Sequence, residues 1–342
     1  MSWRRDYDEE DVRVRPPRSS RPRTRIRPRH ADAVEAMVVQ VHLGRYICDR
    51  DGTRVVAMRA RELGRHAVVV GDRVALVGDV SGDPDRLARI VRVEPRRSVL
   101  RRSADDAERA GEGRRERVLV ANADQLVIVS SLVDPPPRTG FIDRCLVAAY
   151  DADITPLLCL TKVDLLEDDA PLTDLLDYYA ELSLPYVLCR PDQPLTALAD
   201  RLRGRSSVLV GHSGVGKSTL VNRLVPGADR AVGEVSAIGK GRHTSSNAVA
   251  LRLPGPEPSG WIVDTPGVRS FGLAHVSPDS LLASFADLVE GSADCPPHCD
   301  HAPGGECALD RWVADGHADP RRLASYRRLL ASREGDRWDE AE

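Results

Sequence analysis

Residues 211 to 219 have the types and the spacing that a phosphate-binding loop needs. In order they are Gly211, His212, Ser213, Gly214, Val215, Gly216, Lys217, Ser218 and Thr219. Glycines let such a loop turn its backbone N–H groups toward a phosphate chain, and a helix that starts after the loop adds a favourable dipole. In this pattern Lys217 reaches the β- and γ-phosphates and the Ser218 hydroxyl binds Mg²⁺. The loop therefore predicts a nucleoside triphosphate site.

A second motif, Asp264-Thr265-Pro266-Gly267, closes an apolar run that begins at Trp261. A carboxylate at the end of a strand beside a phosphate loop can hold Mg²⁺ through water, and the N–H of Gly267 can contact a γ-phosphate. Taken alone, the same four residues also form an ordinary turn. Because a phosphate loop precedes them, we interpret them as the second half of the nucleotide site.

A third motif, Thr161-Lys162-Val163-Asp164, ends the apolar run at 155–160. The Asp164 carboxylate can accept hydrogen bonds from N1–H and from the exocyclic amine of guanine, a donor pair that adenine lacks. The stem of Lys162 can stack over the base. The motif favours GTP, and an ATP-dependent NTPase is the alternative that a competition experiment with ATP would test.

Cysteines and histidines gather near the C-terminus in a loop without apolar periodicity. Such residues are poor core material and good ligands for tetrahedral Zn²⁺. A closed site of four protein ligands would be structural. We predict that the ligands are Cys295, Cys299, His301 and Cys307, with His298 as the alternative for one of them.

The N-terminal third of the chain divides into a basic tail and a β-rich segment. Residues 1–35 include ten arginines before position 30 and too few apolar side chains for a core, so we expect disorder. The tail is either a solvated charge run or an arm that binds RNA phosphates. Five or six short β-like runs in 36–95 predict a small OB-like β-barrel, although an SH3-like barrel has a similar pattern.

The rest of the chain is read as a linker, an α/β domain and a helical end. Residues 96–124 are rich in arginine and predict a mobile linker. Strand-like and helix-like runs alternate through 125–275, which indicates a parallel sheet covered on both faces. Residues 276–342 contain the cysteine cluster and a helix-like stretch at 311–330.

The order of these motifs supports a family resemblance. The guanine motif precedes the phosphate loop and Asp-Thr-Pro-Gly comes last, so the α/β domain resembles a circularly permuted GTPase domain. Together with the barrel and the zinc-binding helical domain, the chain resembles the ribosome small subunit-dependent GTPase family over roughly residues 36–330. The resemblance implies GTP and GDP, Mg²⁺, one structural zinc, and a partner in the small ribosomal subunit and its rRNA.

The resemblance also implies roles for the segment between the phosphate loop and Asp264. Residues 239–246 match the family's first switch, in which a hydroxyl completes the Mg²⁺ shell. We predict Thr244 for this ligand, with Ser245 as the alternative. Val268 stands where Ras-like enzymes have a glutamine that orients water, so the resemblance points to His243 as the catalytic residue beside Lys217. A solvated loop residue is the other interpretation of His243.

Composition restricts the remaining classes of function. The net charge of −3 requires that any affinity for nucleic acid comes from local patches. Four of the seven cysteines lie singly in apolar runs, as in proteins of a reducing compartment, and no apolar run is long enough to span a membrane. We expect a monomeric, cytoplasmic GTP hydrolase that acts in late maturation of the small subunit. The rival from another class is a non-catalytic RNA-binding zinc protein.

Overall fold

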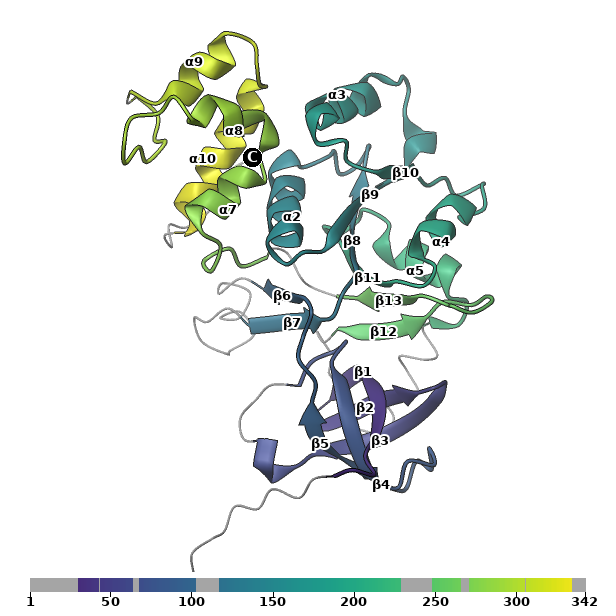
Figure 1. Ribbon diagram of the computed structural model, residues 1–342. Coiled ribbons are helices and arrows are strands. Elements are labelled where there is room, and N and C mark those ends of the chain that lie inside the picture. Colours follow the sequence, from purple (N-terminus) through teal and green to yellow (C-terminus); the bar gives the residue numbers. More distant parts are fainter. Residues whose placement is uncertain are drawn as a thin grey trace, which may run out of the picture. The chain divides into compact units, whose positions relative to one another are not determined.

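A computed structural model gives the arrangement of the chain (Figure 1) and describes residues 30–42, 44–63, 68–102, 117–228, 248–265, 271–304 and 306–333. The predicted arginine-rich tail lies outside these residues as far as position 29. Within the described ranges, no helix has both the length and the apolarity that a membrane span requires.

The first five strands close into a barrel. They are β1 (Val34–His42), β2 (Arg45–Arg50), β3 (Thr53–Arg59), β4 (Arg73–Gly78) and β5 (Ala88–Val93). Around the barrel the strands follow the order β1-β2-β3-β5-β4, and β4 pairs again with β1. Strands β3 and β5 are parallel, whereas the other pairs are antiparallel. The OB-like barrel predicted from the sequence is confirmed, and it has five strands where five or six were expected.

The sequence also has a β-like run at 67–70, whose described residues, 68–70, form no strand. Among them Val70 pairs, in an isolated bridge with Val120. The chain then turns at Gly71, where φ is +88° and a Cβ atom would lie 2.0 Å from the carbonyl oxygen of Ala121. Only glycine allows the backbone of the barrel to approach so closely here.

Two further strands, β6 (Val99–Arg102) and β7 (Arg117–Ala121), form an antiparallel ribbon within the segment that the sequence predicts to be a linker. Arg96 forms two hydrogen bonds of 2.7 and 2.9 Å with the buried carboxylate of Asp72 in the barrel. The side-chain amide of Asn122 donates to the carbonyl oxygen of Gly71. These contacts join the ribbon to the barrel through polar groups.

The α/β part of the sheet has the strand order β10-β9-β8-β11-β13-β12. All its strands are parallel except β12, which runs antiparallel to β13. Strand β12 also pairs with β1 of the barrel at one position, Gln40 opposite Val249. The six strands are β8 (Gln125–Ser131), β9 (Thr155–Thr161), β10 (Tyr186–Leu188), β11 (Ser206–Val210), β12 (Val249–Arg252) and β13 (Trp261–Asp264).

Helices cover both faces of this sheet (Figure 1), as the alternation of elements predicts. Leu126 and Ile128 of β8 pack in one apolar cluster with residues of α2 (Thr139–Asp151) and α3 (Ala170–Tyr178). The intervening residues, Val127 and Val129, pack in a second cluster with α4 (Thr196–Leu202) and α5 (Lys217–Leu224). Because successive strand side chains point to opposite faces, one apolar run serves two cores.

The C-terminal helices are α7 (Pro278–Ala283), α8 (Ala286–Ser292), α9 (Ala308–Ala314) and α10 (Pro320–Arg333). The prediction of a single helix-like stretch at 311–330 is wrong, because the chain forms two helices there, α9 and α10. Between them Gly316 has φ +85°, and Pro320 starts α10. A left-handed glycine ends a helix, and proline is suited to the first turn of the next one.

Candidate functional site

The phosphate-loop residues connect β11, in the middle of the sheet, with α5. A Cβ atom at Gly211 would lie 2.5 Å from the carbonyl oxygen of Val129 on the neighbouring strand, so no other residue fits. Gly214 and Gly216 have φ values of +84° and +91°, which side chains rarely allow. The buried side chain of Val215 anchors the loop between them. Helix α5 begins directly at Lys217, as the pattern predicts.

Lys217 and Asp264 face each other across the end of the sheet. Asp264 is the last residue of β13 and pairs in register with Leu209 of β11. Its Oδ1 lies 3.4 Å from Nζ of Lys217. This oxygen is buried and accepts no hydrogen bond from the part of the chain that the structure describes. A buried carboxylate oxygen beside a lysine can serve as a ligand for a cation or for the water bound to one.

The predicted guanine motif reaches the phosphate loop from the other side. Thr161 is buried, and its hydroxyl donates a 2.6 Å hydrogen bond to the carbonyl oxygen of Val215, which is 54 positions later in the chain. Lys162 has a left-handed backbone with φ +56°, and its Nζ donates to the carbonyl oxygen of Asp134. Asp164 lies exposed in the short 3₁₀ turn Val163–Leu165. The tertiary structure thus brings the predicted base and phosphate motifs together.

Several predicted site residues lie outside the described ranges. They are His243, Thr244 with its alternative Ser245, and Gly267 with its neighbour Val268. Their roles remain predictions.

The four predicted metal ligands form a compact cluster. Their ligand atoms all lie within 4.8 Å of one another. Sγ of Cys295 is 3.9 Å from Sγ of Cys307, and the distances from Nδ1 of His301 to these two sulfurs are 3.6 and 3.5 Å. Tetrahedral Zn²⁺ with ordinary bond lengths separates two sulfurs by about 3.8 Å and a sulfur from a nitrogen by about 3.6 Å. The cluster therefore fits one zinc ion.

The surrounding residues favour this ligand set over the alternative with His298. His298 is exposed and does not belong to the cluster. Burial lowers the pKa of His301, which favours the neutral imidazole that binds metal. Burial raises the pKa of the Cys307 thiol to about 11, which disfavours the thiolate until a cation binds beside it. Arg327 of α10 fixes the loop by donating to the carbonyl oxygen of His301 at 2.7 Å and to both carboxylate oxygens of Asp310.

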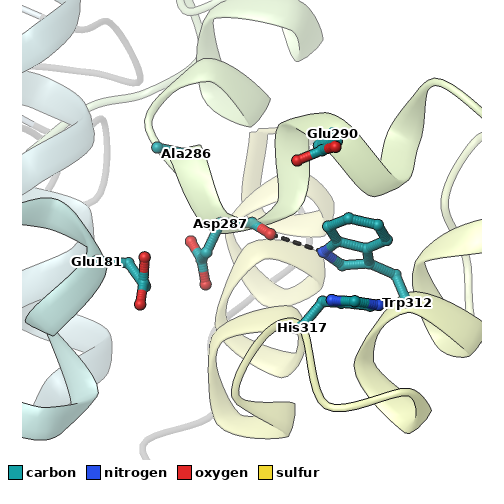
Figure 2. A pocket seen from close by; sticks show the side chains of 6 residues that line it. All are labelled: Glu181, Ala286, Asp287, Glu290, Trp312 and His317. Carbon is teal, nitrogen blue, oxygen red and sulfur yellow. Dashed lines mark hydrogen bonds between the residues drawn. The ribbon is translucent and has the colours of Figure 1, made fainter.

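A hollow of about 400 Å³ lies between the C-terminal helices and the turn at Glu181. Figure 2 shows the rings of Trp312 and His317 close together in it. The two rings are stacked, with centroids 4.1 Å apart. The indole N–H donates to the carbonyl oxygen of Asp287. None of the predicted nucleotide or metal ligands lines it. The lining residues are Glu181, Ala286, Asp287, Glu290, Trp312 and His317.

A buried ionic group is the feature that the sequence did not indicate. Arg322 of α10 is 2% exposed, and it forms a bidentate pair of 2.7 and 2.8 Å with Asp287 of α8. Its Nη1 also lies 3.6 Å from Oδ1 of Asp143 in α2. Arg322 follows Arg321 in a charged stretch of sequence, which is typical of a solvated helix face. No local signal distinguishes the buried arginine from the exposed one.

Comparison with known proteins gives concordant matches. The family model described as RsgA GTPase matches residues 93–274, more than half of the chain. The chain is 40% identical over 272 residues to the small ribosomal subunit biogenesis GTPase RsgA of Ectopseudomonas mendocina. The aligned region covers 78% of this chain and 75% of that protein. It is 35% identical over 273 residues to the protein of the same name from Chlorobaculum parvum, which covers 79% and 86%.

Two solved structures share the fold. The crystal structure of YjeQ from Thermotoga maritima aligns with a TM-score of 0.65 at 24% identity, over 89% of this chain and all of that one. The structure of YloQ, described as a circularly permuted GTPase, aligns with a TM-score of 0.64 at 22% identity, over 91% and 99%.

Proposed function

The chain belongs to the RsgA GTPase family of small ribosomal subunit biogenesis GTPases and is a GTP hydrolase, and from this premise we propose how its residues perform and control the reaction. The proposal is supported chiefly by the 2.6 Å hydrogen bond from Thr161 to the carbonyl oxygen of Val215. This contact fixes the distance between the segment proposed to hold guanine and the loop proposed to hold the phosphates.

Guanine is held by the segment from Thr161 to Asp164. Asp164 is exposed at the start of a turn, where its carboxylate is free to accept from the two donors on the guanine edge. Lys162 extends toward Asp134, so its stem forms a wall beside the base. The phosphates lie against the backbone N–H groups of residues 211–219, with Lys217 compensating their charge.

Mg²⁺ would be held by Ser218, Thr244 and Asp264, and when bound it supplies charge that stabilises the transferred phosphoryl group. The buried Oδ1 of Asp264, which accepts no hydrogen bond from the described residues, supports this assignment. Lys217, now 3.4 Å from that oxygen, would turn to the β- and γ-phosphates when GTP binds. The N–H of Gly267 would contact the γ-phosphate.

Hydrolysis is an in-line attack of water on the γ-phosphate, with the water oriented by His243. Because Val268 cannot orient water, the free protein turns over slowly. Docking on the small ribosomal subunit orders His243 and accelerates the reaction. The barrel, basic segments and the zinc-bearing C-terminal helices bind rRNA, and the monomeric protein acts in the cytoplasm. One structural zinc, bound by Cys295, Cys299, His301 and Cys307, stabilises the fold of the C-terminal loop.

The experiment is GTP turnover by the full-length protein with and without purified small subunits. We expect acceleration of the order of 10³–10⁵-fold, the range that a catalytic group such as an arginine finger gives other GTPases. His243→Ala should bind GTP normally and lose most of the acceleration. Lys217→Ala is the matched inactive control and should hydrolyse nothing in either condition. Raising the salt concentration should reduce stimulation before it affects intrinsic turnover, because rRNA phosphates dominate docking.

Equal rates with and without subunits at low salt would disprove the ribosomal control. A fully stimulated His243→Ala variant would remove only the role of that residue.

A further inference from the structure

The first turns of helix α2 touch the phosphate loop directly. The ring of Phe141 lies against the ring of His212, with centroids 4.3 Å apart and planes inclined by 53°. His212 follows Gly211, which packs so closely on β8 that a Cβ atom there would lie 2.5 Å from the carbonyl oxygen of Val129. The contact with Phe141 therefore helps to fix the start of the phosphate loop.

The same helix is held to α10 by the buried ionic group. Asp143 is 1% exposed; its Oδ1 lies 3.6 Å from Arg322, and its Oδ2 accepts a 2.9 Å hydrogen bond from the hydroxyl of Tyr178. Arg322 also lies over the ring of Phe285, 4.8 Å from its centroid. Separating Arg322 from Asp143 would leave the buried Asp143 carboxylate without its counter-ion, which is costly in a low-dielectric interior. Helices α2 and α10 should therefore move together.

Arg144, the next residue of α2, contacts two further segments. Its Nη1 donates to the carbonyl oxygen of Phe271 at 3.0 Å, and its Nη2 donates to the hydroxyl of Ser332 in α10 at 2.7 Å. Phe271 is fully buried and lies seven positions after Asp264, the residue that faces Lys217. One turn of α2 thus touches the phosphate loop, the segment after β13 and the last helix.

From these contacts we infer that Phe141 is a positioning residue for the phosphate loop and that α2 couples this loop to α10. The inference rests on the proposed function, because it requires that GTP binds at residues 211–219. When the nucleotide fixes the loop, His212 restrains Phe141 and with it α2. The contacts of Asp143 with Arg322 and of Arg144 with Ser332 then restrain α10. If GTP changes the affinity of the C-terminal helices for a partner by some factor, the bound partner must change the affinity for GTP by that same factor.

Hydrogen–deuterium exchange of the full-length protein tests this coupling without ribosomes. Exchange is measured free and saturated with a non-hydrolysable GTP analogue. In the wild type the analogue should slow exchange in the phosphate loop and also in α10. Phe141→Leu keeps an apolar side chain but removes the ring, and it should lower the protection of α10 by about twofold or more while the phosphate loop stays protected.

Two further variants separate positioning from general loss of structure. Phe141→Tyr keeps a ring and should restore protection of α10. Tyr186→Leu makes the same kind of change at an exposed aromatic on β10, and it should leave the protection unchanged. For turnover, Phe141→Leu should lower kcat more than it raises KM.

Each outcome has a definite meaning. Analogue binding without protection of α10 in the wild type would overturn the coupling and leave the proposed function intact. Full protection of α10 in Phe141→Leu would overturn the role of Phe141. Failure of the wild type to bind the analogue would overturn both the proposed function and the coupling.

Discussion

The barrel and the C-terminal helices are attached to the nucleotide-binding sheet in different ways. The barrel has its own apolar cluster, formed entirely by residues of β1–β5 and their turns, such as Val38, Cys48 and Ile90. The C-terminal helices have no separate cluster among the described residues. Phe285, Leu309 and Tyr326 belong to the same continuous core as Ile128 of β8 and the buried face of α2.

The ionic contact that attaches the barrel is more exposed to solvent than the one that attaches the C-terminal helices. Arg96, whose side chain is 23% exposed, pairs with Asp72 where the ribbon meets the barrel. Arg322, whose side chain is 3% exposed, pairs with carboxylates of α2 and α8. The C-terminal helices thus pack in the core of the GTPase fold, whereas the barrel keeps a cluster of its own and contributes a few residues, such as Val39 and Ile47, to the shared core. This difference explains why coupling to the nucleotide is expected through α2 and α10.

The largest expected effect is that of removing zinc. We propose that zinc binds only in the C-terminal loop, so its removal should affect that loop and not the barrel. Structural zinc in small motifs contributes on the order of 10 kcal/mol of apparent binding free energy. Chelation should therefore expose Cys295, Cys299 and Cys307 to iodoacetamide, as mass spectrometry would detect. Cys48 should stay unreactive in the barrel, because it is fully buried.

Two variants sharpen the zinc experiment. Cys299→Ser should lower the metal content from one equivalent per chain, and His298→Ala should leave it unchanged. The reverse result would show that the ligand set is wrong.

The second largest expected effect is the loss of stability when Arg322 or Arg96 is replaced. Arg322→Met leaves Asp143 and Asp287 buried without a counter-ion, and we expect it to lower the free energy of unfolding of the whole GTPase fold by about 3–5 kcal/mol. Arg96→Met is the matched change at the barrel junction. Since water can reach Asp72 after the substitution, its cost should be about 1.5–3 kcal/mol and should fall on the barrel. Urea unfolding followed by circular dichroism measures both.

Equal losses in the two variants would contradict the importance of burial. A separate early transition of the C-terminal helices in the wild type would contradict the shared core.

The smallest effect is a pH dependence of the barrel. Burial raises the pKa of the Cys48 thiol to about 12. The folded barrel therefore retains this proton when the unfolded chain, with a thiol pKa of about 8.5, releases it. The contribution to stability is fully present below about pH 8.5 and is lost as pH rises toward 12, by about 1 kcal/mol at pH 9.5. Unfolding at pH 8 and 9.5 should show this loss in the wild type and a smaller loss in Cys48→Ala. Identical pH dependences would mean that Cys48 does not contribute.

The sequence by itself determined the chemistry and most of the elements. The glycines and lysine of residues 211–219, the four metal ligands and the alternation of strands and helices are local patterns, because each depends on residue types within about one turn, loop or strand. The barrel was recognisable from short β-like runs. The sequence did not indicate which strands pair to close it, since the pairing of β4 with β1 depends on contacts between distant segments.

Only the tertiary structure decided which of these pieces meet. The hydrogen bond from Thr161 to Val215 depends on β8 lying between β9 and β11, an order that no local pattern encodes. The burial of Arg322 but not of Arg321 depends on which face of α10 packs against α2. Such contacts join residues that are tens to more than a hundred positions apart, and their free energy exists only when the intervening chain has folded. The sequence therefore specified what the site can do, and packing determined what the site is connected to.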